Sequence, residues 1–206
     1  DEKKLYKLNR FREIIQEHSG KMIPYISGGS SVTIPLIFKN EIPEGINHFR
    51  VGETLFFGTN VYTGLPFKEM HHDVFTLTAE IIEMQQKPNV PSGLAGKNLS
   101  GETPVFSDEE KGKSSLRAIV DVGLLDMDCK DIALLIPDAT IIGASSDMLI
   151  LDLGENPEDL QVGDNINFSM NYMAVLRAMS SDYIDKKVET QKVTLEKAKA
   201  EIICQN

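Results

Sequence analysis

Two short stretches near the beginning of the chain carry residue types that could bind a phosphate and a ring. Residues 27–31 read Ser-Gly-Gly-Ser-Ser, and glycines with small hydroxyls between a strand and a helix let backbone N–H groups approach a phosphate closely. Residues 50–53 read Arg-Val-Gly-Glu, and Arg50 could hold the ring of the same ligand. A Gly-Ser run alone is more often a solvated turn, and a lone arginine is more often a surface ion-pair partner. Together the two stretches predict half of a site for a phosphorylated cofactor.

The elements expected around these stretches alternate between helix and strand. Residues 3–18 predict an amphipathic helix that stops at Gly20, with one face formed by Leu5, Leu8, Phe11, Ile14 and Ile15. We expect a strand over 22–27, a helix through 34–38 capped by Ser30 or Ser31, and a strand over 51–57 ended by Gly58. This alternation is typical of a parallel α/β fold, but a closed (β/α)₈ barrel takes about 250 residues.

The pattern changes after residue 60 to short runs that alternate between apolar and polar residues. Such runs, separated by turns, predict a compact β domain, and they cover residues 74–83, 116–120, 139–143, 148–153 and 165–170. Residues 87–113 are rich in Pro, Gly, Ser, Asn and Lys, which indicates a long surface excursion. A terminal helix is expected from about residue 192 onward.

Composition excludes several classes of partner. The 206 residues carry a formal charge of −10, and no basic cluster suits nucleic acid or an anionic membrane. No apolar run approaches the roughly 20 residues of a membrane span, and no signal peptide is recognisable, so we expect a cytoplasmic protein. Cys129 and Cys204 lie far apart and outside any Cys-x-x-Cys spacing, so we expect neither a disulfide framework nor a metal site.

The order of several motifs makes the chain resemble a known family. Segments 27–31, 47–58 (NHFRVGETLFFG), 143–153 (GASSDMLILDL), 162–168 (VGDNINF) and 171–183 (NYMAVLRAMSSDY) together are similar to the alanine racemase superfamily, and more narrowly to its alanine/ornithine racemase branch. These are pyridoxal-phosphate enzymes with an N-terminal (β/α)₈ barrel and a C-terminal β domain, and their dimers place the β domain of one subunit against the barrel mouth of the other.

The resemblance implies a domain organisation. Residues 1–58 would be the last two β/α units of an incomplete barrel, residues 59–185 the C-terminal β domain and residues 186–206 a helical tail. The expected fold class is therefore α+β and mostly β. The expected partners are a small amino-acid substrate and a second copy of the chain in a homodimer, with no nucleic acid and no membrane.

The resemblance also implies roles for individual residues. The family's phosphate-binding Asn-Ser pair falls on Ser30 and Ser31, so the first position departs from asparagine. The arginine that donates to the pyridine nitrogen falls on Arg50, and Gly52 and Glu53 would offer backbone N–H groups to the phosphate. The family's phosphate-binding tyrosine, which lies in the β domain, falls on Tyr172. The expected cofactor-binding residues are therefore six: Ser30, Ser31, Arg50, Gly52, Glu53 and Tyr172.

Two catalytic features of the family have no counterpart in the sequence. No lysine of the chain corresponds to the Schiff-base lysine of the first barrel strand, and residues 91–101 lack the tyrosine expected there. Asp147 matches a segment that approaches the active site of the partner subunit, where it could have a supporting role. We therefore expect the C-terminal portion of an amino-acid racemase that is inactive by itself.

Two other hypotheses stay open. The first is a non-catalytic β-domain module for dimerisation or interaction, whose N-terminal helices cover exposed strands. The second is a translation-factor-like β-barrel, which offers no use for Arg50. A ligand held between Ser31 and Gly52 would favour the racemase hypothesis.

Overall fold

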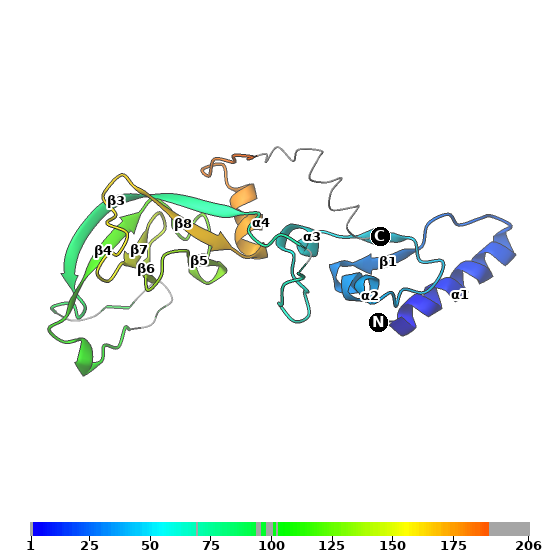
Figure 1. Ribbon diagram of the computed structural model, residues 1–206, viewed down its shortest axis with the longest axis horizontal. Helices are drawn as coiled ribbons and strands as arrows, with labels where there is room; N and C mark the ends of the chain where they lie inside the picture. The colour runs from blue at the N-terminus through cyan, green and yellow to red at the C-terminus, as the bar shows by residue number, and fades with distance from the viewer. Residues whose placement is uncertain (1, 69, 94–95, 98–100, 102, 190–206) are drawn as a thin grey trace, which may run out of the picture.

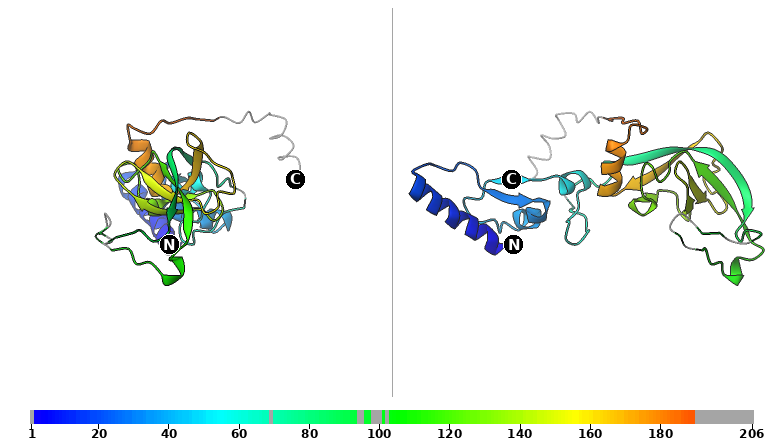
Figure 2. Two further views of the ribbon diagram at one scale, coloured as in Figure 1. Left: turned by 90° about the vertical axis from the view of Figure 1, so that its left-hand side faces the viewer. Right: turned by 180° about the vertical axis from the view of Figure 1, so that it is seen from behind.

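The protein consists of an N-terminal α/β part and a β domain arranged end to end (Figure 1). The computed structural model describes residues 2–68, 70–93, 96–97, 101 and 103–189. Figure 2 shows the same elongated arrangement from behind, with the N-terminal helix and the β domain at opposite ends. Among the described residues, no helix combines the length and the apolar character needed to cross a bilayer. The expected terminal helix lies outside the described residues.

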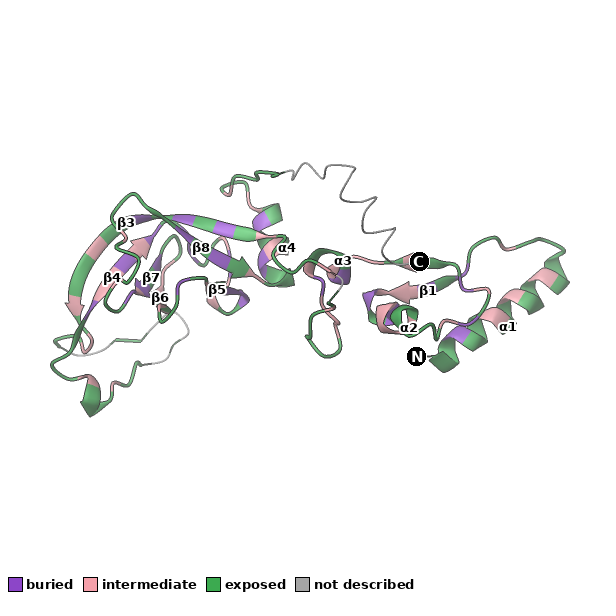
Figure 3. Ribbon diagram, viewed as in Figure 1, coloured by how far each residue is buried: buried purple, intermediate pink, exposed green. Residues whose placement is uncertain are grey.

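The first helix confirms the amphipathic pattern. Helix α1 spans Glu2–Ser19 and ends at Gly20, whose N–H donates to the carbonyl of Gln16 at 2.9 Å and whose φ of +65° is left-handed. Leu5 packs with Ile26 and Ile46 in a small core. The rest of its apolar face stays largely exposed (Figure 3).

The first strand begins later than the expected range of 22–27. Strand β1 spans Ser27–Ser30, and the residues just before it bind the side chain of Asn47 and the backbone N–H groups of Asn47 and His48. The side chain of Asn47 accepts from the N–H of Ile26 at 2.9 Å and donates to the carbonyl of Pro24 at 2.8 Å. The carbonyl of Ile26 also accepts the N–H groups of Asn47 and His48, at 3.3 and 3.2 Å, so the polar backbone groups of this segment are paired with residues 47 and 48.

The helix expected through 34–38 is present but short. A 3₁₀ turn, η1, spans Ser31–Thr33, and helix α2 spans Ile34–Phe38. The expected side-chain cap is wrong, since the Ser30 side chain makes no capping hydrogen bond and the Ser31 hydroxyl accepts the N–H groups of Gly52 and Thr54 instead. The Thr33 hydroxyl donates to the carbonyl of Ser30 at 2.8 Å.

The expectation of a strand over 51–57 is wrong. Strand β2 spans only His48–Arg50, and helix α3 follows at Glu53–Phe57. Gly58 does end the element, but as a left-handed helix cap whose N–H donates to the carbonyl of Thr54 at 2.9 Å. Thr54 is 1% exposed and its own N–H donates to Ser31. These tertiary contacts override the strand propensity of the sequence.

The β domain is a single antiparallel sheet in the order β5-β8-β3-β4-β7-β6. Its strands are β3 (Thr76–Pro88), β4 (Ser114–Val120), β5 (Ile132–Leu134), β6 (Thr140–Ala144), β7 (Leu149–Asp152) and β8 (Asn165–Met170). The long strand β3 pairs with β8 through its first half and with β4 through its second half. The five strands expected from alternation are thus confirmed, with small differences at their ends.

Alternation along these strands fills the core of the β domain. In β3 every second residue from Leu77 to Ile81 is buried, and the fully buried Phe168 and Leu151 lie in the same cluster. The described part of the excursion begins after β3 and contains a 3₁₀ turn, η2, at Asp108–Glu110.

Candidate functional site

A cleft lies where α4, the helix Tyr172–Ser180 that follows β8, meets the N-terminal part. Its volume is about 270 Å³, and its lining residues are Ser30, Ser31, Val32, Arg50, Gly52, Glu53, Val61 and Tyr172. All six residues expected to bind the cofactor are among them. Figure 1 shows α3 and α4 next to each other at this junction, although they lie far apart in the sequence.

The pairing of β1 with β2 brings the two N-terminal motifs together. The two strands are parallel, and Ser30 is the Cα partner of Arg50. Gly28 allows this approach, because a Cβ at that position would lie 2.5 Å from Ile46 and 2.6 Å from Phe49. The two motifs that the sequence separates therefore share one edge of a short sheet.

Ser31 links the two motifs through its hydroxyl. Its Oγ accepts the N–H of Gly52 at 3.3 Å and the N–H of Thr54 at 3.2 Å, and Ser31 is 7% exposed. With both acceptor positions of the oxygen used, the O–H remains as a donor that needs an acceptor. The N–H of Gly52 is occupied by Ser31, so it reaches a phosphate only by sharing or changing this partner.

Tyr172 enters the cleft from the β domain. It is the first residue of α4, and the Asn171 side chain caps this helix by accepting the N–H of Ala174 at 3.0 Å. The Tyr172 ring packs edge-on against Phe57, with 6.1 Å between the ring centroids. The tyrosine is 39% exposed. Phe57 of α3 and the cap of α4 together fix where this side chain lies.

The cleft is lined by one cationic side chain, Arg50, and one anionic side chain, Glu53. Among the described residues, Arg50 makes no ion pair with a carboxylate. Glu53 lies in the first turn of α3, where its carboxylate is favoured by the helix dipole. A buried hydroxyl with a spare donor and an unpaired guanidinium thus face one small volume.

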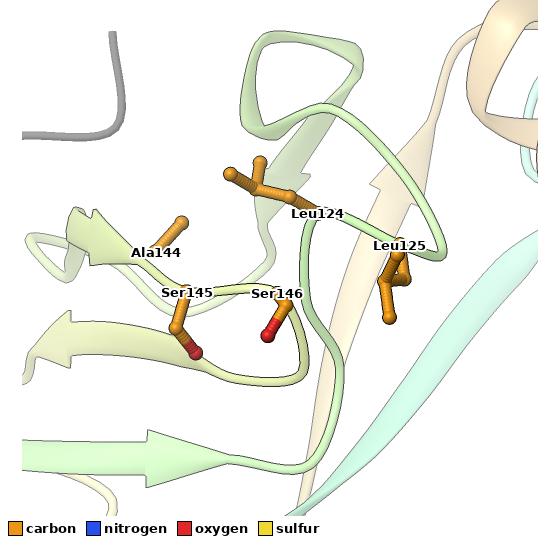
Figure 4. A pocket seen from close by; sticks show the side chains of 5 residues that line it. All are labelled: Leu124, Leu125, Ala144, Ser145 and Ser146. Carbon is orange, nitrogen blue, oxygen red and sulfur yellow. The ribbon is translucent and has the colours of Figure 1, made fainter. Parts of the chain in front are cut away.

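Asp147 lies elsewhere, in the turn between β6 and β7. Its Oδ2 accepts from the Ser146 hydroxyl at 2.9 Å. Beside this turn is a second hollow of about 560 Å³, lined by Leu124, Leu125, Ala144, Ser145 and Ser146. Figure 4 shows the two leucines on the loop after β4, next to the end of β6. The structure therefore separates Asp147 from the cleft within one chain.

Two lining residues and two further elements were missed at the sequence level. Val32 and Val61 line the cleft, but valines in a short helix and a loop give no signal of binding. Strand β5 has only three residues, too few to show alternation. Helix α4 directly follows Asn171, a typical N-cap residue that could have marked its start.

Possible metal ligands do not gather in the described part of the chain. No group of three His, Cys, Asp or Glu side chains there could hold a metal ion. Cys129 is a free cysteine; burial, followed by the nearby Asp128 carboxylate, raises the pKa of its thiol above the ordinary value. Cys204 lies outside the described residues.

The proteins similar to the chain include two curated racemases and the solved structure of another racemase. The ornithine racemase of Acetoanaerobium sticklandii is 39% identical over 166 residues, which cover 81% of this chain and 46% of that protein. The lysine racemase of Thermotoga maritima is 32% identical over 178 residues, covering 86% of this chain and 49% of that protein. The crystal structure of alanine racemase from Oenococcus oeni matches with a TM-score of 0.51 and 18% identity, over 83% of this chain and 47% of that one.

The chain is thus similar to part of two amino-acid racemases, and its fold is that of the alanine racemases. It spans about half the length of the curated relatives it matches. No protein-family model matches it. The fold of this chain is α+β and mostly β, with a β domain of the alanine racemase type preceded by the last two β/α units of an incomplete barrel, as the sequence predicts.

Proposed function

We propose that the chain is the part of a pyridoxal-phosphate-dependent amino-acid racemase that holds the phosphate and the ring nitrogen of the cofactor. The observation that carries the proposal is the convergence of six residues, expected from separate motifs, on one cleft. In this proposal residues 1–58 belong to the barrel, residues 59–185 form the β domain and residues 186–206 are a tail.

The residues present fit the cofactor. The Ser31 hydroxyl and the Tyr172 hydroxyl would donate to phosphate oxygens. The N–H of Glu53 would add a backbone donor, and the N–H of Gly52 would add another by sharing or leaving its Ser31 partner. Arg50 would donate to the pyridine nitrogen. Because a guanidinium keeps its proton, Arg50 would leave that nitrogen uncharged. This suits a racemase, which must return a proton to the same carbon.

Pyridoxal phosphate, when bound, supplies an electron sink that makes the α-proton of an amino acid acidic. Racemisation then needs one base to remove this proton and another group to return it on the opposite face. We propose ornithine, lysine, alanine or a similar amino acid as substrate. The curated relatives are named for ornithine and lysine, and the fold is that of an alanine racemase.

We propose that the 206-residue chain does not racemise amino acids by itself. None of the described residues that line the cleft is a lysine, and the chemistry requires a lysine that bonds to the cofactor aldehyde. The chain would supply binding groups, while the lysine would come from the preceding part of the barrel. A cytoplasmic homodimer is the proposed setting of the whole racemase.

Calorimetric titration tests the binding role. The probe is pyridoxine 5′-phosphate, because it has no aldehyde and cannot react with surface lysines, and unphosphorylated pyridoxine is its matched control. We expect the phosphorylated probe to bind more tightly and Arg50→Ala to weaken both. Equal or absent binding of the two probes would overturn the proposal.

A second measurement tests the inactivity. The chain is incubated with pyridoxal phosphate and L-ornithine, L-lysine or L-alanine, and the enantiomers are separated by chiral chromatography. We expect no D-amino acid above the level of a protein-free control. Enantiomer formation that depends on the chain would contradict the proposed inactivity but not the binding role.

The second hollow favours an alternative, a module for dimerisation. Leu125 is 75% exposed at its edge, and the resemblance places the neighbouring Asp147 near a partner subunit. Sedimentation velocity of the chain and of Leu125→Glu distinguishes the two functions. A dimer that Leu125→Glu dissociates, together with no binding of pyridoxine 5′-phosphate, would support the module over the racemase.

A further inference from the structure

Behind Tyr172 lies a buried carboxylate that belongs to neither motif of the cleft. Asp131 ends the 3₁₀ turn η3, Cys129–Asp131, and its side chain is 7% exposed. A buried carboxylate is costly unless polar partners surround it. The side-chain partners of Asp131 come from the N-cap and the last turn of α4.

Three contacts join Asp131 to this helix. The backbone N–H of Asn171 donates to the Asp131 carbonyl at 2.9 Å, and Nδ2 of Asn171 donates to Oδ1 of Asp131 at 3.0 Å. Nη1 of Arg177 lies 3.5 Å from Oδ2 of Asp131. Both carboxylate oxygens and the carbonyl of one residue are therefore used to hold one helix.

The same contacts decide how Asn171 is oriented. With its Nδ2 held by Asp131, the amide presents Oδ1 to the N–H of Ala174 at 3.0 Å. An amide flipped about its side chain would lose both bonds, because an oxygen would then face the carboxylate. Asp131 thus selects the cap orientation at the residue that directly precedes Tyr172.

We propose that Asp131, acting through Asn171, is a positioning residue that fixes the Tyr172 side chain at the mouth of the cleft. The inference rests on the proposed function, since Tyr172 needs a fixed position only if its hydroxyl binds the cofactor phosphate. The Phe57 ring holds Tyr172 from the other side. Asp131 therefore sets the backbone of this residue, and Phe57 limits its ring.

The first test uses no ligand. In the 206-residue chain, nuclear Overhauser contacts between the Tyr172 and Phe57 rings are recorded by NMR. The chain has 5 tyrosines, and Tyr172→Phe assigns the relevant signals. We expect Asp131→Ala to remove these ring contacts while the contacts between β3 and β8 persist. Retention of the ring contacts in Asp131→Ala would overturn the inference.

A matched variant controls for the loss of a carboxylate in the same turn. Asp128 caps η3 by accepting the N–H of Lys130 at 3.2 Å, and asparagine keeps that ability. We expect Asp128→Asn to leave the ring contacts unchanged. If Asp131→Ala does not fold, Asn171→Ser replaces it, because serine still caps the helix but gives no amide donor to Asp131.

The second test separates the inference from the function. The ratio of the affinities for pyridoxine 5′-phosphate and pyridoxine reports the phosphate contact. We expect this ratio to fall on the order of tenfold in Tyr172→Phe and in Asp131→Ala, as for a lost hydrogen bond to a charged group. Asp131→Asn keeps a neutral acceptor for Asn171, so it should restore part of the ratio.

Each outcome has one meaning. The double variant Asp131→Ala/Tyr172→Phe should lose no more than Tyr172→Phe alone, because the two residues act through one contact. A ratio that falls in Tyr172→Phe but not in Asp131→Ala overturns the inference and leaves the proposed function intact. A wild-type chain that does not prefer the phosphorylated probe overturns the proposed function, and the ring contacts still decide whether Asp131 positions Tyr172.

Discussion

Ser30 and Arg50 are Cα partners in the parallel pair of β1 and β2. A serine from a glycine-rich segment and an arginine from a later motif therefore lie on adjacent strands, and both line the cleft. In parallel pairing neighbouring strands lie about 4.8 Å apart, so the two side chains can contact one ligand. This register is what makes one site out of two motifs.

Arg50→Ala should weaken the binding of pyridoxine 5′-phosphate by about tenfold or more, since it removes a charged donor from the cleft. Arg50→Lys should restore little, because an ammonium group does not reproduce the planar geometry of a guanidinium. Isothermal titration calorimetry measures both. Arg10→Ala, on the exposed surface of α1, is the control and should bind as the wild type does; equal affinity in Arg50→Ala would contradict the role of Arg50.

Ser31→Ala and Ser30→Ala form a matched pair for stability. Ser31 accepts two backbone N–H groups, so its loss leaves the buried N–H of Thr54 without this partner and should cost about 1–3 kcal/mol. Among the described residues no hydrogen bond to the Ser30 hydroxyl is formed, so Ser30→Ala should stay within about 0.5 kcal/mol of the wild type. Urea unfolding, followed by hydrogen exchange in residues 27–58, measures the difference, and equal stabilities would refute it.

The strands of the β domain were predictable because half-buried strands leave a period of two in the sequence. The runs 74–83 and 165–170 show this pattern; the structure has strand β8 at Asn165–Met170, whereas β3 spans Thr76–Pro88 and so extends five residues beyond the alternating run. In the segment 51–57 the local sequence pattern predicts a strand, but residues 53–57 form a helix. Its strand-like residues form a helix because Ser31 draws two backbone N–H groups of this segment toward itself.

The set of residues that line the cleft was expected from the resemblance and not from local chemistry. Nothing near Tyr172 in the sequence marks it as a partner of Ser31, and the two residues meet only because α4 lies against α3. The start of α4 in turn depends on Asp131, a residue far from Asn171 in the sequence. Contacts of this kind carry no periodicity, so a single sequence does not reveal them.

Gly28→Ala should destabilise the N-terminal part. Its Cβ would meet Ile46 at 2.5 Å and Phe49 at 2.6 Å, and overpacking of this kind costs about 1–3 kcal/mol. Gly96→Ala is the control, because a Cβ there meets nothing within 4 Å. Hydrogen exchange should report faster opening of β1 and β2 in Gly28→Ala, with unchanged protection in β3 and β8. Unchanged exchange in β1 would show that the strands do not pair this closely.

Cys129 should react slowly with a thiol reagent in the folded chain. Burial, with a smaller contribution from Asp128, raises the pKa of the thiol, and the thiolate is the reactive form. Because the folded pKa lies above the unfolded one, the folded chain holds the proton more tightly, and stability falls as pH rises from the unfolded pKa to the folded pKa.

The variant Cys204→Ser leaves Cys129 as the only thiol, and Ellman's reagent at pH 7.5 measures the rate of its reaction with and without urea. We expect a slower rate without urea and a modest acceleration by Asp128→Asn, since that variant removes the negative charge near the thiol. A folded chain that reacts as fast as the unfolded one would contradict the burial of Cys129.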